Sequence, residues 1–343
     1  MKVVFIYPGL HKAHQPFIEA INADLCPVYD KHIKGFRRFV NAFKMAKNYP
    51  DYDVYVIEGG MPMFPVFIRK YLLNKKNIII GLLADETFIN LVQRQKHYTL
   101  AETIIHKLSA RCLDGAIAVS PMVRDFARKI INIPIEVVRP SIPEENYVKL
   151  GKVKPDLESK IIVSVGEARF SIGMDILVEH FITAKQYIHD LQLWIVGKGH
   201  PKYYERIKGV KVLGYVEDLA EIFEMASLFV HAGRCSAYPV ATLEAMRAGL
   251  PVIVSDMTGT KEIVEKVEAK VKKEFNLSYK GTKFIQPLDK IFEGIIFYYK
   301  LSLDIRENLS KVYKRYSQEF EPKKRGKDFA NKFNKLLEII KGD

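Results

Sequence analysis

A single carboxylate, Glu244, lies in an otherwise apolar stretch that reads PVATLEAM over residues 239–246. Pro239 is typical of a first helical position, and Gly249 is placed to end the helix in the left-handed conformation. The first turn of a helix presents free N–H groups and a partial positive charge to whatever lies in front of it. The stretch therefore predicts a ligand site at this turn, with a capping or ion-pair role for Glu244 as the alternative.

Three cations, Arg169, Arg234 and Lys261, each follow a predicted strand in the second half of the chain. The carboxyl ends of parallel strands meet at one edge of a sheet, and such folds bind ligands there. We therefore expect these side chains at the ligand edge, where they suit an anionic group. The alternative is that they are loop cations paired with acids such as Glu167.

A second group of candidates follows strands in the first half of the chain. His11 and His14 come after the first strand, where two histidines three positions apart suit an anionic ligand, unless each merely packs in its loop. Gly9 permits a close backbone approach at the same turn. Asp85 follows the strand at 78–83 and is a candidate for binding ligand hydroxyls.

Short apolar strands alternate with helical segments along the chain, which predicts doubly wound parallel sheets with helices on both faces. The proline-rich stretch 139–155 is the natural linker between two such α/β halves, whose ligand edges are expected to share one cleft. Neither a G-x-G-x-x-G motif after the first strand nor a P-loop motif is present, so dinucleotide and P-loop nucleotide binding are not supported. The predicted strands are 3–7, 54–57, 78–83, 116–119 and 135–138, then 161–165, 193–196, 210–213, 228–231 and 252–254.

Length and composition suit a soluble protein of two domains. The 343 residues are 48% hydrophobic, and no apolar run approaches the roughly 18 residues that a membrane helix needs. The three cysteines show no metal-binding spacing, and their odd number suits a reducing compartment. We therefore expect a cytoplasmic protein without a cysteine-based metal site.

The net charge of +13 is spread along the chain, except in residues 26–50, where six lysines and arginines face one aspartate. Because no nucleic-acid-binding module is recognisable, this charge does not support a nucleic-acid partner. The segment, with Lys31, Lys34 and Phe43 among its residues, resembles a basic amphipathic helix. Such a helix is typical of a peripheral contact with an anionic membrane surface, or of a solvated helix packed on a sheet.

Four segments of the second half resemble the retaining glycosyltransferases of the GT-B fold, the group that includes glycogen synthases and sucrose synthases. They occur in the order and spacing of that family over about 100 residues. The segments are VSVGEARFSIGMDILVEHF (163–181), LQLWIVGKG (191–199), VKVLGYVEDLAEIFEMASLFVHA (210–232) and the Glu244 helix continuing to GTKEIV (259–264).

The resemblance implies transfer of a sugar from a nucleotide-sugar donor with retention, without a metal ion or a further cofactor. It places the donor on a domain at 151–315 and an unknown acceptor (a glycan, a lipid-linked molecule or a small molecule) on a domain at 1–150. A helix at 316–343 would return to the first domain. The implied donor-binding residues are Gly166, Gly214, Tyr215, Val216, Ser236, Val240, Ala241 and Glu244, with Gly9, His11, His14 and Asp85 on the acceptor side.

Two departures from the family pattern concern catalysis. Ser236 stands where the family has the first of two glutamates, and Glu167 and Ile172 stand where it has an arginine and a lysine that hold the donor diphosphate. Arg169, Arg234 and Lys261 are then the candidates for stabilising the leaving diphosphate. The alternative is a catalytically inactive protein of the same fold that binds a nucleotide sugar or a glycan.

Overall fold

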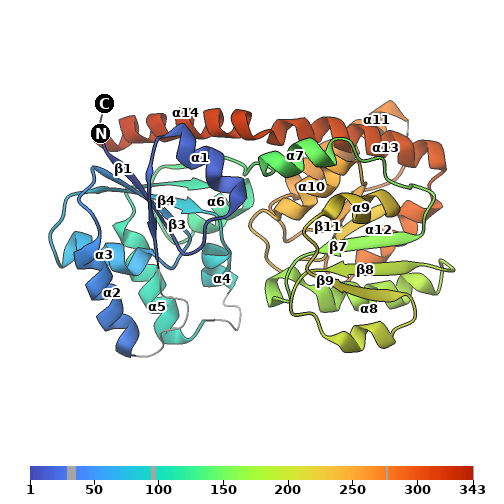
Figure 1. Cartoon of the computed structure of the whole chain (residues 1–343), viewed down its shortest axis with the longest axis horizontal. Coiled ribbons are helices and arrows are strands. Elements are labelled where there is room, and N and C mark those ends of the chain that lie inside the picture. The colour runs from blue at the N-terminus through green and yellow to red at the C-terminus, as the bar shows by residue number, and fades with distance from the viewer. Residues whose placement is uncertain (29–35, 94–97, 276, 343) are drawn as a thin grey trace. The chain divides into compact units, whose positions relative to one another are not determined.

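The computed structural model describes residues 1–28, 36–93, 98–275 and 277–342. The chain divides into two compact units, one formed by residues 1–141 with 322–343 and the other by residues 142–321 (Figure 1). We call them the N-terminal unit and the C-terminal unit and describe each by itself.

The N-terminal unit contains one six-stranded parallel sheet in the order β2-β1-β3-β4-β5-β6. Its central strands are apolar because helices cover both faces, as a parallel sheet requires. The strands are β1 (Val3–Tyr7), β2 (Asp24–Pro27), β3 (Val54–Glu58), β4 (Ile78–Leu83), β5 (Gly115–Ala118) and β6 (Ile135–Val137). The helices are α1 (Gln15–Ala20), α2 (Phe36–Asn48), α3 (Met63–Tyr71), α4 (Thr87–Gln93), α5 (Leu100–Ser109), α6 (Pro121–Ala127) and α14 (Pro322–Lys341).

The C-terminal unit contains a second six-stranded parallel sheet in the order β12-β11-β10-β7-β8-β9. The strands are β7 (Ile161–Val165), β8 (Gln192–Val196), β9 (Val210–Gly214), β10 (Leu228–His231), β11 (Val252–Ser255) and β12 (Ile285–Gln286). The helices are α7 (Glu144–Leu150), α8 (Met174–Lys185), α9 (Leu219–Met225), α10 (Val240–Ala248), α11 (Lys261–Glu274), α12 (Ile291–Lys300) and α13 (Leu303–Tyr316).

The predicted α/β class with two doubly wound sheets is confirmed, and all ten predicted strands are present. The sequence missed β2 and β12. Both lie at the edge of a sheet, and β2 is largely exposed while β12 has two residues, so neither carries a long buried apolar run. The cleft expected between the domains stays a prediction.

Each sheet has a point where the strand order reverses, between β1 and β3 in one unit and between β7 and β10 in the other. Folds of this kind bind ligands outside the carboxyl ends of the strands at such a switch point. The candidate residues are therefore expected at these two positions.

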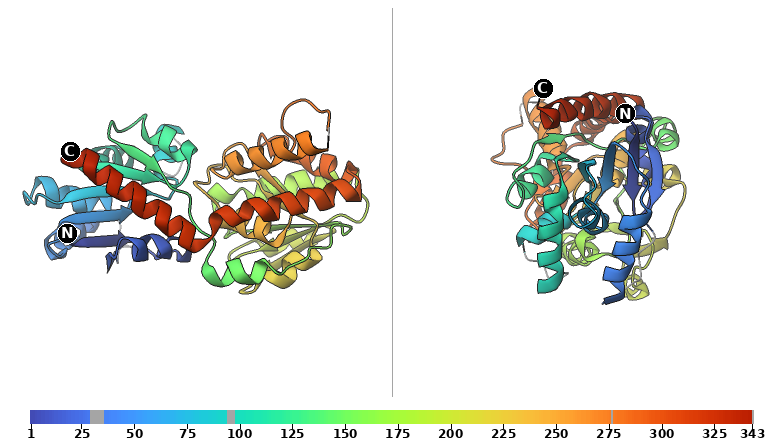
Figure 2. Two further views of the ribbon diagram at one scale, coloured as in Figure 1. Left: turned by 90° about the horizontal axis from the view of Figure 1, so that it is seen from above. Right: turned by 90° about the vertical axis from the view of Figure 1, so that its left-hand side faces the viewer.

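The C-terminal helix α14 packs on α1, β5 and β6 within the N-terminal unit, as Figures 1 and 2 show. The ring of Phe329 stacks on that of Phe17 with centroids 4.5 Å apart. Gly326 allows the close contact, because a Cβ there would lie 2.7 Å from the carbonyl oxygen of Pro16. The predicted return of the C-terminal helix to the first domain is confirmed.

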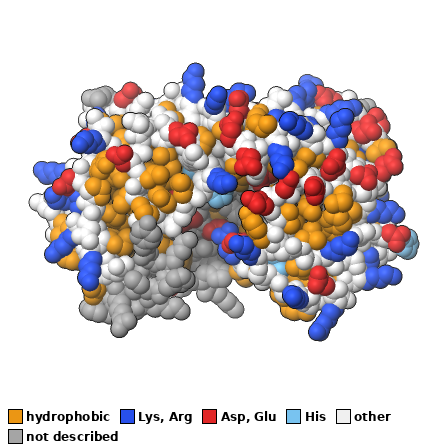
Figure 3. Space-filling view, viewed as in Figure 1, with side chains coloured by type: hydrophobic (Ala, Val, Ile, Leu, Met, Phe, Trp, Pro, Cys, Tyr) orange, Lys and Arg blue, Asp and Glu red, His pale blue; other side chains and the backbone are white. Residues whose placement is uncertain are grey.

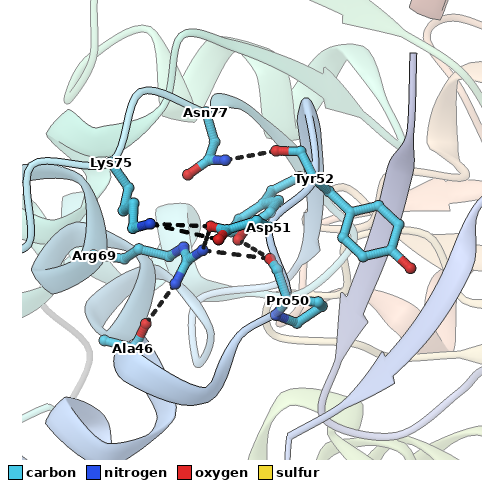
Figure 4. A network of polar contacts seen from close by, with 8 residues as sticks. Ala46, Pro50, Asp51, Tyr52, Arg69, Lys75 and Asn77 are labelled. Atoms are coloured by element: carbon cyan, nitrogen blue, oxygen red, sulfur yellow. Dashed lines mark hydrogen bonds and ion pairs between the residues drawn. The ribbon is translucent and has the colours of Figure 1, made fainter.

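A buried arginine fixes the opposite, amino-terminal end of β3 (Figure 4). Arg69 of α3 donates to the carbonyl oxygen of Ala46 at 2.9 Å and to that of Pro50 at 3.4 Å, and it forms an ion pair with Asp51. Lys75 also donates to Asp51, at 3.5 Å. This network joins α2, α3 and the turn before β3, and it lies at the other end of the strand from the ligand edge.

The surface carries mixed charge. On the face viewed in Figure 3, lysine and arginine side chains are scattered among acidic ones. None of the helices within the described ranges combines the length and the apolar character that crossing a bilayer would take.

Candidate functional site

The loops that follow β7 and β10 meet at the switch point of the C-terminal unit. The N–H of Arg234 donates to the carbonyl oxygen of Ser171 at 2.9 Å. Gly173 has φ of 68°, and a Cβ there would lie 1.9 Å from the carbonyl oxygen of Ala232. Only a glycine fits a left-handed conformation and a backbone this close, so the contact between the two loops depends on Gly173.

The loop after β11 joins the same site through Ser236. The N–H of Ser236 donates to the carbonyl oxygen of Met257 at 3.2 Å, and its own carbonyl accepts from the N–H of Gly259 at 2.9 Å. Three loops at the carboxyl ends of β7, β10 and β11 are therefore held together mainly by backbone hydrogen bonds.

The hydroxyl of Ser236 contacts a histidine that the sequence did not single out. His231 ends β10 and is fully buried, with its Nε2 2.9 Å from Ser236 Oγ. Burial lowers the pKa of His231 to about 4, and its Nδ1 has no hydrogen-bond partner within the described residues. A neutral imidazole therefore contacts Ser236 at the carboxyl end of β10. A polar residue at the end of an apolar strand is the signal in the sequence.

Helix α10 presents its first turn at this edge of the sheet. Pro239 caps it without a side-chain hydrogen bond, and the N–H of Thr242 donates back to the carbonyl oxygen of Pro239 at 3.1 Å. In the described part of the chain, the N–H groups of Val240 and Ala241 have no protein acceptor. As predicted, the helix ends at Gly249 in the left-handed conformation.

Glu244 lies on α10 and is buried, with 7% of its surface exposed. Its Oε1 accepts a hydrogen bond from Nδ2 of Asn146 at 2.6 Å. Burial raises the pKa of Glu244, and the hydrogen bond from Asn146 opposes the rise. Within the described residues Oε2 accepts no hydrogen bond, so one carboxylate oxygen is available to a ligand.

Each of the three predicted cations has a partner within the protein. Arg234 forms a bidentate ion pair with Asp175, at 2.8 and 2.6 Å, and lies over the ring of Phe170. Arg169 is exposed and 3.8 Å from a carboxylate oxygen of Glu167. Lys261 begins α11 and donates to the carbonyl oxygen of Asp256 at 2.8 Å. The hydrogen bonds from Arg234 lower the pKa of Asp175.

Gly166, which follows β7, and Gly214, which ends β9, form a second part of this edge. The carbonyl oxygen of Gly166 lies 2.7 Å from Nε2 of His200, and that of Gly214 accepts from the N–H of Gly197 at 2.7 Å. Tyr215 is 66% exposed, with the Lys198 ammonium 4.7 Å from its ring centroid. Val216 follows in the same turn and is half-buried.

The switch point of the N-terminal unit is built from side chains. Nδ1 of His14 lies 2.6 Å from Oε1 of Glu58, and both residues are less than a tenth exposed. His11 accepts a hydrogen bond from the N–H of Ala13 at 3.2 Å, and its ring centroid is 5.5 Å from that of His14. Gly9 is exposed in the turn after β1.

Glu58 was not predicted from the sequence. It is the last residue of β3, whose five residues are all buried, and its Oε2 has no partner within the described residues. The signal in the sequence is an acid that ends a buried apolar strand and is followed by two glycines.

Asp85 lies at the end of the neighbouring strand β4 and holds backbone groups. Its carboxylate accepts from the N–H of Gly60 at 2.9 Å and from the N–H and hydroxyl of Thr87 at 3.1 and 2.9 Å. It therefore links the turns that follow β3 and β4.

The basic segment at 26–50 is described in part. Lys31 and Lys34 lie outside the described residues. In α2, Val40 and Phe43 are exposed, and the Lys47 ammonium lies 5.1 Å from the ring centroid of Phe43. Across the residues that can be assessed, no group of histidine, cysteine, aspartate and glutamate side chains has the arrangement of a metal site.

Residues 159–275 match the family described as group 1 glycosyl transferases. Mannosylfructose-phosphate synthase of Agrobacterium fabrum is 23% identical over 189 residues, which are 46% of this chain and 41% of that protein. The chain aligns with less than half of the length of the curated relatives that it matches.

Two solved structures are similar over nearly the whole chain. HepE of Anabaena, in complex with UDP and glucose, is 13% identical with a TM-score of 0.71, over 98% of this chain and 100% of that chain. Sucrose-phosphate synthase of Thermosynechococcus elongatus is 14% identical with a TM-score of 0.72, over 99% of each chain. At these identities the likeness shows the fold.

Proposed function

We propose that this chain is a retaining group 1 glycosyltransferase with the GT-B fold and that it transfers a sugar from a nucleotide-sugar donor to an acceptor. The observation that carries the proposal is the position of the β7–β10 switch point and of Glu244, which lie within the residues that match the family. The UDP and glucose bound by HepE support a nucleotide sugar as the donor. Retention at the anomeric carbon and independence of a metal ion are part of the proposal.

The C-terminal unit would bind the donor. Glu244 accepts hydrogen bonds from the ribose hydroxyls through Oε2, since Asn146 already occupies Oε1. The backbone of Gly214, Tyr215 and Val216 contacts the base. This assignment gives the buried carboxylate the second partner that it lacks in the protein.

The diphosphate would lie between the loops after β7 and β10. The free N–H groups of Val240 and Ala241 and the positive end of α10 favour an anion there. The backbone at Gly166 and Ser236 lines the same edge. Arg169, Arg234 and Lys261 then neutralise the charge on the leaving diphosphate, which is the largest contribution such an enzyme makes.

The N-terminal unit would bind the acceptor, at Gly9, His11, His14 and Asp85. In the proposed division, residues 1–150 form the acceptor domain, 151–315 the donor domain and 316–343 the helix that packs back on the first. The acceptor is a glycan, a lipid-linked molecule or a small molecule.

A protein that binds a nucleotide sugar without turning it over is the second candidate. Two observations favour it: Arg234 and Arg169 face the carboxylates of Asp175 and Glu167, and Ser236 replaces a glutamate of the family pattern. In that case the cations hold the loops together.

We also propose a peripheral contact with an anionic membrane surface, at the cytoplasmic face of the inner membrane. Val40 and Phe43 of α2 are exposed beside Lys44 and Lys47, which suits apolar insertion combined with attraction to acidic lipids. Sedimentation with phosphatidylglycerol vesicles that weakens at high salt supports this contact, whereas equal binding to phosphatidylcholine vesicles contradicts it.

Thermal shift across UDP, GDP, ADP and CMP sugars tests the function, with mass spectrometry of any released nucleotide. A ligand that binds only the native state raises the melting temperature. Stabilisation with release of the nucleotide supports a transferase, and stabilisation without release in the presence of an acceptor panel supports the binding protein. If no nucleotide sugar stabilises the chain, the donor site at Glu244 is wrong.

A further inference from the structure

The His14–Glu58 pair lies where a ligand is expected, and its hydrogen-bonding capacity is not fully used within the described residues. His14 belongs to the short 3-10 helix Lys12–His14 after β1, and Glu58 ends β3, so the pair occupies the β1–β3 switch point. Oε1 of Glu58 is hydrogen-bonded to Nδ1 of His14, whereas Oε2 has no hydrogen-bond partner among the described residues. A buried carboxylate oxygen is costly to leave without a hydrogen bond, and the described residues of this unit offer it none.

Outside the bond between them, the two side chains can offer hydrogen-bond acceptors. A carboxylate oxygen accepts the hydrogen bond, so the proton of this bond is on Nδ1 of His14, and in the neutral tautomer with this proton Nε2 holds a lone pair. Oε2 of Glu58 is buried without a hydrogen-bond partner among the described residues, and it is a second acceptor. Two acceptors on one hydrogen-bonded pair suit a ligand that brings two donors, and they disfavour a phosphate or a carboxylate.

The imidazole is held in place by its neighbours. The ring of His14 stacks on Phe17 at 5.6 Å and 17°, and Phe17 stacks on Phe329 of α14. The adjacent Ala13 is fully buried, and its carbonyl oxygen accepts from the hydroxyl of Ser141 at 2.9 Å. A ring that is fixed on two sides loses little freedom when a ligand binds, which is the condition for a preorganised site.

We infer that the His14–Glu58 pair binds two neighbouring hydroxyl groups of the acceptor, which is therefore an uncharged sugar or polyol at this position. The inference rests on the proposed function in one respect, that the ligand of the N-terminal unit is the acceptor. It replaces the expectation of an anionic ligand at His11 and His14, since Glu58 would repel one.

Binding to the full-length chain tests the inference without requiring turnover. Saturation-transfer NMR is run with glucose, galactose, mannose, N-acetylglucosamine and glycerol, and with glucose 6-phosphate as the charged comparison. We expect at least one neutral compound to bind and glucose 6-phosphate to bind more weakly than glucose. Failure of every neutral compound to bind, or preference for the phosphate, overturns the inference.

The matched variants are Glu58→Gln and Glu136→Gln. In Glu58→Gln an amide oxygen still accepts from Nδ1, while an NH₂ group replaces the free acceptor oxygen, so the affinity for the neutral sugar falls about tenfold or more. Glu136 lies on β6 in the same unit and pairs with Lys335 at 2.7 Å, so Glu136→Gln leaves the affinity unchanged. Equal affinities of Glu58→Gln and wild type contradict the inference, provided that both melt cooperatively.

A measurement on the unmodified chain covers the case in which Glu58→Gln does not fold. Long-range ¹H–¹⁵N spectra of the histidine rings report which nitrogen carries the proton, with His14 assigned from a His14→Gln variant. We expect His14 in the form protonated at Nδ1, with Nε2 shifting when the neutral sugar is added. An Nε2-protonated ring, or no shift at saturating sugar, overturns the assignment.

The outcomes for acceptor and donor are separable. Release of nucleotide to water requires the donor but no sugar acceptor, so it reports donor cleavage separately. We expect Glu58→Gln to raise the KM for the acceptor, while the control Glu136→Gln keeps both the wild-type KM and the wild-type rate of release to water. If neutral sugars bind at His14 but no donor is ever cleaved, the proposed transfer fails and the hydroxyl site stands.

Discussion

At the β7–β10 switch point backbone groups and a glycine form the site, whereas at the β1–β3 switch point two buried side chains form it. Gly173 lies so close to the neighbouring loop that a Cβ on it would be 1.9 Å from the carbonyl oxygen of Ala232. His14 and Glu58 instead meet through a 2.6 Å hydrogen bond at the ends of strands that are neighbours in the sheet. The two units therefore share a sheet topology but present different groups, backbone at one switch point and side chains at the other.

The difference teaches what each unit can recognise. Free N–H groups, a helix N-terminus and cations favour anions, and this combination is found only in the loops of the C-terminal unit among the sites described above. A lone pair and a carboxylate favour hydroxyl donors. The first site should be sensitive to added volume at the backbone, and the second to a change of charge.

The largest effect is expected from Gly173→Ala. A left-handed alanine costs roughly 1–2 kcal/mol by itself, and the new methyl group also meets a backbone carbonyl that cannot turn away. The loops after β7 and β10 must then separate, so the affinity for the nucleoside diphosphate found in the thermal-shift screen should fall at least about 100-fold by calorimetry.

Alanine variants at two other left-handed glycines are controls that separate backbone strain from the clash with the Ala232 carbonyl. Gly281 has φ of 67° with open space where a Cβ would lie. Gly59 has φ of 72°, and a Cβ there would lie 2.5 Å from Oδ2 of Asp85, which is in the other unit from the nucleotide site. Both alanine variants should bind nucleotide like the wild type. Retention of wild-type affinity by Gly173→Ala would remove the distinction between a backbone site and a side-chain site.

The next largest effect is expected from Arg234→Ala, which tests whether this cation of the β7–β10 site contributes to catalysis. Asp175 is about half exposed, so the ion pair itself contributes only about 0–1 kcal/mol to stability. If Arg234 stabilises the leaving diphosphate, turnover falls about 100-fold or more with little change in melting temperature. Asp175→Asn removes the same pair but keeps the cation, and it should retain turnover. Equal loss of turnover in both variants would give Arg234 a purely structural role.

Two buried glutamates of the C-terminal unit, Glu244 and Glu268, differ in how their carboxylates are hydrogen-bonded, so the same substitution should have opposite effects on stability. Glu244 has a single side-chain donor, whereas Glu268 accepts the N–H groups of Lys283 and Phe284 at 2.6 and 3.3 Å. Glu244→Gln keeps the Asn146 contact and removes a buried charge, so it should raise stability at neutral pH and lower nucleotide affinity about tenfold. Glu268→Gln should lower stability and leave affinity unchanged.

The pH dependence of the Glu244 effect follows from its raised pKa. As pH rises from 4.5, the unfolded carboxyl loses its proton first, so the folded state holds more protons and loses stability until its own pKa is passed. The stability difference between Glu244→Gln and wild type should therefore shrink below about pH 4.5 in urea titrations. A difference that is constant with pH would mean that Glu244 is not the group responsible.

More of the fold than of the site could be predicted from the sequence, and particular residues show why. Alternating apolar runs and glycines predict β7, β10 and α10, because these signals are local. The partners of the candidate residues are not local: Asn146 and Glu244 are 98 positions apart, and His14 and Glu58 are 44 apart. Spacing in one sequence does not encode such pairs, so Glu244 was predicted without its donor and His14 without its acceptor.

The last prediction distinguishes the two buried histidines, one at each switch point, by an effect that is small near pH 7 and grows as pH falls. His231 has a hydroxyl, Ser236 Oγ, where His14 has a carboxylate, and burial lowers the pKa of His231 to about 4 from 6.5. Between these values the unfolded state binds more protons, so stability falls as pH falls, by up to about 3 kcal/mol. His231→Gln lacks this titration, and its stability relative to wild type should rise from pH 7 to pH 4 in urea unfolding. Parallel curves for the two proteins would mean that His231 is not held neutral by burial.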